Sequence, residues 1–201
     1  GYLIAGNVQF VTIGTMNAIT YKEVFPSIQD NRLWLGVTHF NKGMYFGVPE
    51  AFEYSDSYNF DREQAGVKVA RVSGVCWFTN VDHGRRHEPL QLMSEEDNRK
   101  YNKKIAEVGY PKYDNYDAIE VCQVNAIPSD HDGAMGVPIT FLNKYNPDQF
   151  EIVGSFNAGS AGKELGATPT EIVTKGKTMM WNGPVVERAA LYKRIVIRRK
   201  G

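Results

Sequence analysis

The first eighty residues alternate between short apolar runs and turn residues. Residues 9–13 form an apolar run that predicts a buried strand, and residues 33–37 predict a second strand with apolar residues on both faces. The apolar spacing between them is that of a helix, for which Asn17 is a suitable N-cap. Pro26 interrupts this helix and predicts a kink or a restart. A strand, a helix and a doubly buried strand together favour a parallel βαβ unit.

The next stretch has a different pattern. Residues 39–66 contain several glycines and no lasting periodicity, which is typical of a long loop that could hold a short hairpin. The runs 67–72 and 74–79 predict a pair of antiparallel strands, the second central in a sheet because it is apolar on both faces. From residue 82 to 104 the chain is polar, and residues 94–108 have the charged composition of a surface helix.

We place a domain boundary in this polar stretch, between residues 82 and 83. Beyond it, short apolar runs separated by turn residues predict strands at 118–121, 139–142, 150–153 and 191–197. The segment from Gly159 to Gly183 is rich in Gly, Thr and Lys and predicts an exposed loop or a long hairpin. The expected fold class is α/β for residues 1–82, followed by a β-rich α+β region for residues 83–201.

Composition narrows the function only slightly. Twenty-three basic and 23 acidic residues cancel, so any contact with nucleic acid must come from local patches. Cys76 and Cys122 lie in apolar runs without metal-ligand spacing and are predicted to be buried free thiols. No apolar stretch approaches the roughly 20 residues needed to cross a bilayer, so we expect a cytoplasmic protein without a membrane partner.

The histidines give no sign of a metal site. His39, His83, His87 and His131 lack the spacing of metal ligands, so we assign no metal-binding residue. The segment from Asp130 to Gly133 lacks the remaining ligands of a calcium-binding loop and is better explained as a turn.

Several long segments of this sequence resemble those of one enzyme family. They are FVTIGTMNAITYKEVFP, WLGVTHFNKGMYFGVP, RVSGVCWFTN, YPKYDNYDAIEV, DHDGAMGVPITFLNKYNPDQFEIVG and ALYKRIVIRRK. Through them the chain resembles the EcoRI methylase family of adenine-specific DNA methyltransferases over most of its 201 residues. One departure is Thr15, where the family usually has Asn, although a small polar residue is kept.

The resemblance implies a class I, Rossmann-like methyltransferase that uses S-adenosylmethionine to methylate adenine N6 in double-stranded DNA. The family's Asn-Pro-Pro-Phe motif is missing, because none of the nine prolines adjoins another, and so is a glycine-rich FxGxG turn for the cofactor. In the family the segment that matches residues 10–25 comes shortly after the Asn-Pro-Pro-Phe motif. This order implies that the present chain starts downstream of it, with the first strand, residues 33–38 and residues 74–79 as strands five, six and seven of the methyltransferase sheet.

We therefore assign no catalytic residue, and expect that the chain alone neither binds S-adenosylmethionine nor methylates DNA. A sheet reduced to its last three strands would expose a strand edge and an apolar face. The missing N-terminal catalytic segment, or a companion chain, would be needed to cover that edge.

The resemblance also points to candidate site residues. Thr15 and Asn17 follow the first strand at its carboxyl end, where open α/β sheets bind ligands, and are candidate cofactor-side residues. The simpler role of Asn17 is to cap the following helix. Lys42, Tyr45 and Phe46 lie after the second strand and are candidate DNA contacts, the lysine on phosphate and the rings stacking on bases. The alternative is a solvated lysine beside rings that pack on the core.

A second candidate DNA contact lies at the predicted domain boundary. Arg85, Arg86 and His87 form a compact basic cluster that could bind phosphate, or that could be a solvated charge run. The basic C-terminus is better explained as solvated.

Two functional hypotheses follow. In the first, the chain is part of a site-specific adenine-N6 DNA methyltransferase, with residues 83–201 as the target-recognition region. In the second, it is a stand-alone DNA-binding or assembly module that works with a separate catalytic chain. An inert remnant of a degenerate gene is a third possibility.

Overall fold

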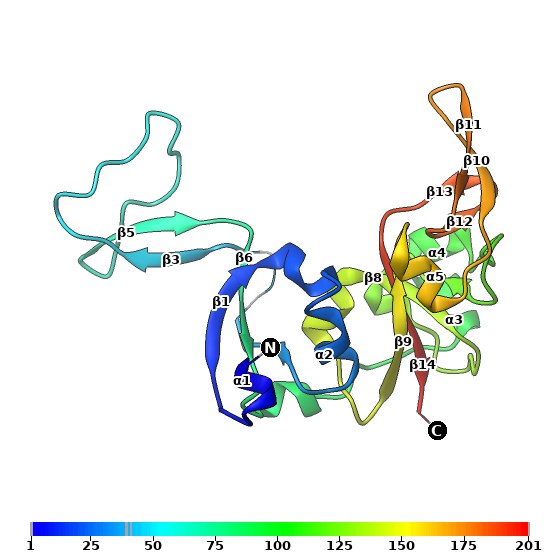
Figure 1. Ribbon diagram of the computed structural model, residues 1–201, viewed down its shortest axis with the longest axis horizontal. Helices are drawn as coiled ribbons and strands as arrows, with labels where there is room; N and C mark the ends of the chain where they lie inside the picture. Colours follow the sequence, from blue (N-terminus) through cyan, green and yellow to red (C-terminus); the bar gives the residue numbers. More distant parts are fainter. Residues whose placement is uncertain (1, 39, 41, 201) are drawn as a thin grey trace.

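The computed structural model describes residues 2–38, 40 and 42–200. It is a mixed α/β structure with several small sheets, from which two hairpins project (Figure 1). No helix among these residues is long and apolar enough to cross a membrane.

The N-terminal part is built on a three-stranded sheet. Its elements are α1 (Tyr2–Ala5), β1 (Val11–Thr15), the 3-10 helix η1 (Met16–Thr20), α2 (Phe25–Gln29), β2 (Trp34–Leu35) and β6 (Val75–Thr79). The strand order is β1-β6-β2, and β6 is antiparallel to both neighbours. The predicted first and second strands therefore point the same way, but β6 separates them, so they are not a directly paired parallel unit.

The segment between β1 and β2 differs in detail from the predicted helix. Thr15, not Asn17, caps the first turn, because its side chain accepts a hydrogen bond from the backbone N–H of Asn17 at 3.4 Å. The predicted restart is confirmed: α2 is a separate helix with Pro26 in its first turn, where a missing N–H leaves no hydrogen bond unmade.

A projecting arm follows β2. It consists of β3 (Met44–Gly47), β4 (Glu63–Gln64) and β5 (Val67–Val72), in the order β3-β5-β4. Figure 1 shows β3 and β5 projecting away from the rest of the molecule. The predicted pairing of residues 67–72 with 74–79 is wrong, because β5 pairs with β3 and β4 whereas β6 pairs with β1 and β2. Gly74, with φ of +72°, lets the chain change direction between the two strands instead of forming a hairpin.

The C-terminal part is centred on a four-stranded sheet in the order β7-β8-β14-β9. Its elements are η2 (Gly84–His87), α3 (Glu95–Tyr101), α4 (Lys103–Val108), β7 (Ile119–Glu120), η3 (Val124–Ala126), β8 (Met135–Pro138), η4 (Ile139–Lys144), β9 (Phe150–Phe156), α5 (Ser160–Leu165), β10 (Thr170–Thr174), β11 (Lys177–Trp181), β12 (Val185–Val186), β13 (Ala189–Ala190) and β14 (Arg194–Arg199).

Two predictions for this part need correction. The predicted strand at 139–142 is wrong: the strand is β8 and ends at Pro138, and η4 follows it. A strand would place Phe141 and Leu142 on opposite faces, whereas η4 buries both. The predicted loop or hairpin at 159–183 is right for β10 and β11, which form a projecting hairpin, but misses α5 (Figure 1).

The two parts share a buried core. Ile19 and Phe78 from the N-terminal part belong to the same hydrophobic cluster as Phe141 and Ile195 from the C-terminal part. The boundary at residue 82 stays a prediction, but the packing shows that the two sides stabilise each other through a common apolar interior. Cys76 is buried as predicted, whereas Cys122 is half-buried, and both are free thiols.

Candidate functional site

The carboxyl end of β1 opens into a cavity. Thr15 and Asn17 are both exposed there, and Asn17 lines a cavity of about 320 Å³. The opposite wall comes from Pro138 to Thr140, where β8 passes into η4, and from Tyr192 to Arg194 at the start of β14. Segments more than a hundred residues apart thus meet beside the predicted cofactor-side residues, whose role in cofactor binding stays a prediction.

A buried ion pair holds one wall of this cavity. Glu120 is 5% exposed, and it accepts hydrogen bonds from Arg194 Nε at 3.0 Å and Nη2 at 2.7 Å. The hydroxyl of Tyr113 donates to the same carboxylate. Burial raises the pKa of Tyr113, and the neighbouring Glu120 raises it further, so the tyrosine stays a donor. Arg194 is neutralised by Glu120, whereas Lys193 has no carboxylate partner within the described residues, and its Nζ donates to Thr20 Oγ1 at 3.2 Å.

The three predicted DNA contacts after β2 lie at the base of the arm. Lys42 is exposed, and its carbonyl accepts a hydrogen bond from Arg71 at 2.5 Å. Tyr45 and Phe46 are half-buried in β3, and the Tyr45 hydroxyl donates to Asp61 at 3.3 Å. Partial burial, followed by the charge of Asp61, raises the pKa of Tyr45. Lys42 remains the most accessible of the three.

The outer part of the arm is an aromatic ladder. Phe52 and Tyr54 have ring centroids 5.3 Å apart, Tyr54 and Tyr58 4.7 Å, and Tyr58 and Phe60 5.7 Å. The arm also carries the acidic residues Glu50, Glu53, Asp56, Asp61 and Glu63. Basic side chains of the arm also lie over these rings, with Arg62 and Lys68 over Tyr54 and Arg71 over Phe60, so the rings are largely engaged within the arm.

The basic cluster of η2 is largely occupied by internal contacts. Arg86 is buried, stacks on Trp34 with its guanidinium carbon 3.5 Å from the ring centroid, and pairs with Asp82 at 2.7 Å. His87 lies between Asp148 at 2.8 Å and Asp82 at 3.0 Å, and both carboxylates raise its pKa, Asp148 more than Asp82. The contacts of Arg86 and His87 favour a structural role.

Arg85 differs from its two neighbours. Its guanidinium donates to the carbonyl of Val37, and it has no carboxylate partner among the described residues. Phosphate binding by the whole cluster stays a prediction, but Arg85 is the member whose charge is available for it.

A second face of the molecule is apolar and lacks a covering element in the described residues. Within the described ranges β1 is paired on its β6 side alone, and Val11 and Ile13 are 63% and 41% exposed. An open cavity of about 380 Å³ lies along this strand, lined by α1, β1 and α2, and its walls are mainly apolar.

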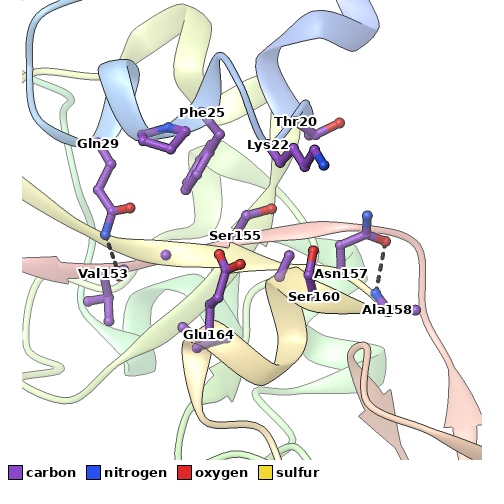
Figure 2. Close-up of a pocket in the computed structure, with 14 residues that line it drawn as sticks. Thr20, Lys22, Phe25, Gln29, Val153, Ser155, Asn157, Ala158, Ser160 and Glu164 are labelled. Atoms are coloured by element: carbon purple, nitrogen blue, oxygen red, sulfur yellow. Dashed lines mark hydrogen bonds between the residues drawn. The ribbon is translucent and has the colours of Figure 1, made fainter.

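Another cavity, of about 250 Å³, lies where the two parts of the chain meet, between α2 and the β9–α5 segment (Figure 2). Gln29 crosses this contact and donates to the carbonyl of Val153 at 2.8 Å. Figure 2 shows Phe25, Ser155 and Glu164 around the same space. The mixture of an aromatic ring, a hydroxyl and a carboxylate gives this cavity no single chemical character.

The described residues contain no cluster of three or more His, Cys, Asp or Glu side chains that could hold a metal ion. His39 lies outside the described residues.

Comparison with known proteins identifies the family. The model of the family described as adenine-specific methyltransferase EcoRI matches residues 1–200. The chain belongs to this family. The resemblance to the EcoRI methylase family that the sequence segments indicated is thereby confirmed.

Curated relatives of the EcoRI methylase family cover most of the chain. The Type II methyltransferase M.EcoRI of Escherichia coli is 44% identical over 165 residues, which are 81% of this chain and 47% of the relative. M.MgeORF184P of Mycoplasma genitalium is 40% identical over 152 residues, covering 75% and 45%. M.MpnI of Mycoplasma pneumoniae is 37% identical over 147 residues, covering 72% and 43%. The chain thus spans about half the length of these methyltransferases, and no solved structure matches it.

Proposed function

We propose that this chain forms the rear of the catalytic sheet and the target-recognition region of a site-specific adenine-N6 DNA methyltransferase. The observation that carries the proposal is the family match from residue 1 to 200, together with relatives named Type II methyltransferases, of whose length the chain matches about half. The proposal names double-stranded DNA as substrate and S-adenosylmethionine as methyl donor.

The sheet supports this assignment. The three segments that the resemblance assigns to strands five, six and seven do share one sheet, with β6 inserted between β1 and β2. Their outer edge at β1 is unpaired in the described residues, and the face beside it is apolar. An exposed strand edge of this kind is a ready site for a further strand. The segment that carries strands one to four in the family would fit there.

The residues of this chain fit S-adenosylmethionine only in part. S-adenosylmethionine would bring a reactive methyl group, and Thr15 and Asn17 offer two exposed polar side chains at the carboxyl end of β1. Two polar groups are too few to enclose a cofactor of this size, and the sequence has no glycine-rich turn after a strand to complete the site. The role proposed for this chain is therefore to support and orient the site, and the isolated chain is expected not to bind the cofactor.

Methyl transfer is tested on the full-length gene product. It is incubated with plasmid DNA and tritiated S-adenosylmethionine, and the modified nucleoside is identified by mass spectrometry. We expect N6-methyladenine from the full-length product and no methylation from the 201-residue chain alone. Methylated cytosine, or methylation by the isolated chain, would contradict the proposal.

The alternative is a module that works with a separate catalytic chain. The two proposals differ in which polypeptide covers the unpaired edge of β1. Hydrogen exchange monitored by mass spectrometry compares β1 in the full-length product and in the isolated chain. Protection of β1 only in the full-length product indicates that the covering strand is part of the same polypeptide. Protection that appears only after a second protein is added favours the module.

A further inference from the structure

Three neighbouring cavities form one groove across the C-terminal part. The cavity beside Asn17 shares Pro138 and Thr140 with a second cavity of about 530 Å³. The second shares Asn125 and Lys144 with a third, of about 340 Å³, which reaches Arg85. Because adjacent cavities share their walls, the groove runs from the end of β1, over η3 and η4, to η2.

The groove is basic although the chain as a whole is neutral. Arg85, Lys144 and Lys193 line it, and none of them has a carboxylate partner among the described residues. Arg194 also lines it but is neutralised by Glu120, and Glu88 is the one acidic residue of the lining in the part of the chain that the structure describes. Three available cations against one carboxylate give a local positive potential, which attracts a polyanion.

Amide side chains lie between these cations. Asn125 is exposed on η3, and Asn143 on η4 is half-buried. The Oδ1 atom of Asn143 is buried without a hydrogen-bond donor among the described residues. Because a buried acceptor without a partner is unfavourable, a turn of this half-buried side chain toward a ligand that supplies a donor is favoured. An asparagine amide offers the donor and acceptor pair that matches the N7 and N6 edge of adenine.

We propose that this groove seats duplex DNA, with Arg85, Lys144 and Lys193 on phosphates and Asn125 and Asn143 at base edges. The inference rests on the proposed function and adds η3 and η4 to it as the reading elements. A protein partner fits the groove less well, because the cores of protein interfaces are depleted in lysine, whereas Lys144 and Lys193 both line the groove.

The test measures DNA binding by the full-length gene product, separately from methylation. Fluorescence anisotropy with a 30-base-pair duplex gives the affinity at several salt concentrations, and sequencing of methylated plasmid DNA gives the site. Lys144→Ala is expected to weaken binding to all duplexes and to lower the salt slope by about 1. Asn143→Ala and Asn125→Ala are each expected to lower the preference for the methylated site by about tenfold. Lys177→Ala, on the projecting hairpin, is the matched control and is expected to change neither quantity.

The outcomes separate this proposal from the proposed function. If the wild type methylates adenine but Lys144→Ala, Asn125→Ala and Asn143→Ala behave like the control, the groove is not the DNA surface although the enzyme assignment stands. If the wild type binds duplex through the groove but methylates nothing, only the proposed function fails. Absence of any duplex binding by the wild type overturns the groove proposal. Thermal melting checks each variant, and Asn125, being exposed, keeps the test valid if Asn143→Ala does not fold.

Discussion

Replacing Glu120 by alanine is expected to destabilise the protein more than any exposed charge substitution. Glu120 is 5% exposed and accepts hydrogen bonds from Arg194 and Tyr113. Its removal leaves the guanidinium of Arg194, whose side chain is only 14% exposed, without a counter-charge. Breaking a buried pair in this way costs about 3–5 kcal/mol, because one desolvated charge remains. For a domain with about 5–15 kcal/mol of stability, this is a large fraction.

Urea denaturation followed by circular dichroism measures the effect. The matched control is Asp30→Ala, which breaks an exposed ion pair with Arg32 whose side chains are 55% and 56% exposed, and which should cost at most about 1 kcal/mol. The double variant Glu120→Ala with Arg194→Met should recover part of the loss, because it removes the stranded charge. If Glu120→Ala and Asp30→Ala lower the free energy of unfolding equally, the reasoning about desolvation is wrong.

Three further predictions concern packing, pH and thiol reactivity. In Gly136→Ala the new Cβ would clash with the Tyr113 hydroxyl, so the ring must move, and thermal melting should show a loss of about 1–3 kcal/mol. The raised pKa of His87, caused first by Asp148, means that its stabilising contact is fully present below its unfolded pKa and is lost as pH rises through its folded pKa. His87→Gln should remove that pH dependence of the melting temperature, and an NMR titration of His87 should give a pKa above 6.5. Burial raises the pKa of the Cys76 thiol to about 11, so it should resist a thiol reagent at pH 8 until urea unfolds the protein.

The apolar runs predicted the strands that lie in the core. Residues 150–153 and 191–197 overlap β9 and β14, because a central strand is apolar on both faces and is recognisable without knowledge of its partners. Pro26 likewise marked the start of α2, since the effect of proline on a helix is local.

The pairing partners of strands and the ends of helices and strands were harder to predict from the sequence. Residues 67–72 and 74–79 are adjacent in sequence and apolar, which favours a hairpin, yet β6 is held between β1 and β2 by contacts with residues more than forty positions away. The end of β8 at Pro138 and the start of η4 depend on how Phe141 and Leu142 reach the core. Local composition contains neither kind of information.

The charge that the candidate site presents also depends on contacts between residues far apart in the sequence. Arg86 and Arg194 lie in basic segments of the sequence, but in the fold Asp82 neutralises Arg86 and Glu120 neutralises Arg194. Glu120 lies 74 residues away from Arg194 in the sequence. What remains in the groove are three scattered cations, of which Arg85 alone belonged to the basic cluster predicted at the domain boundary. Each phosphate contact contributes about 0.9 to the slope of log affinity against log salt, so three contacts predict a slope near −3. Raising salt from 50 to 200 mM should then weaken duplex binding by about 40-fold. A slope much steeper than this would mean that cations outside the groove, such as those at the base of the arm, also contact phosphate.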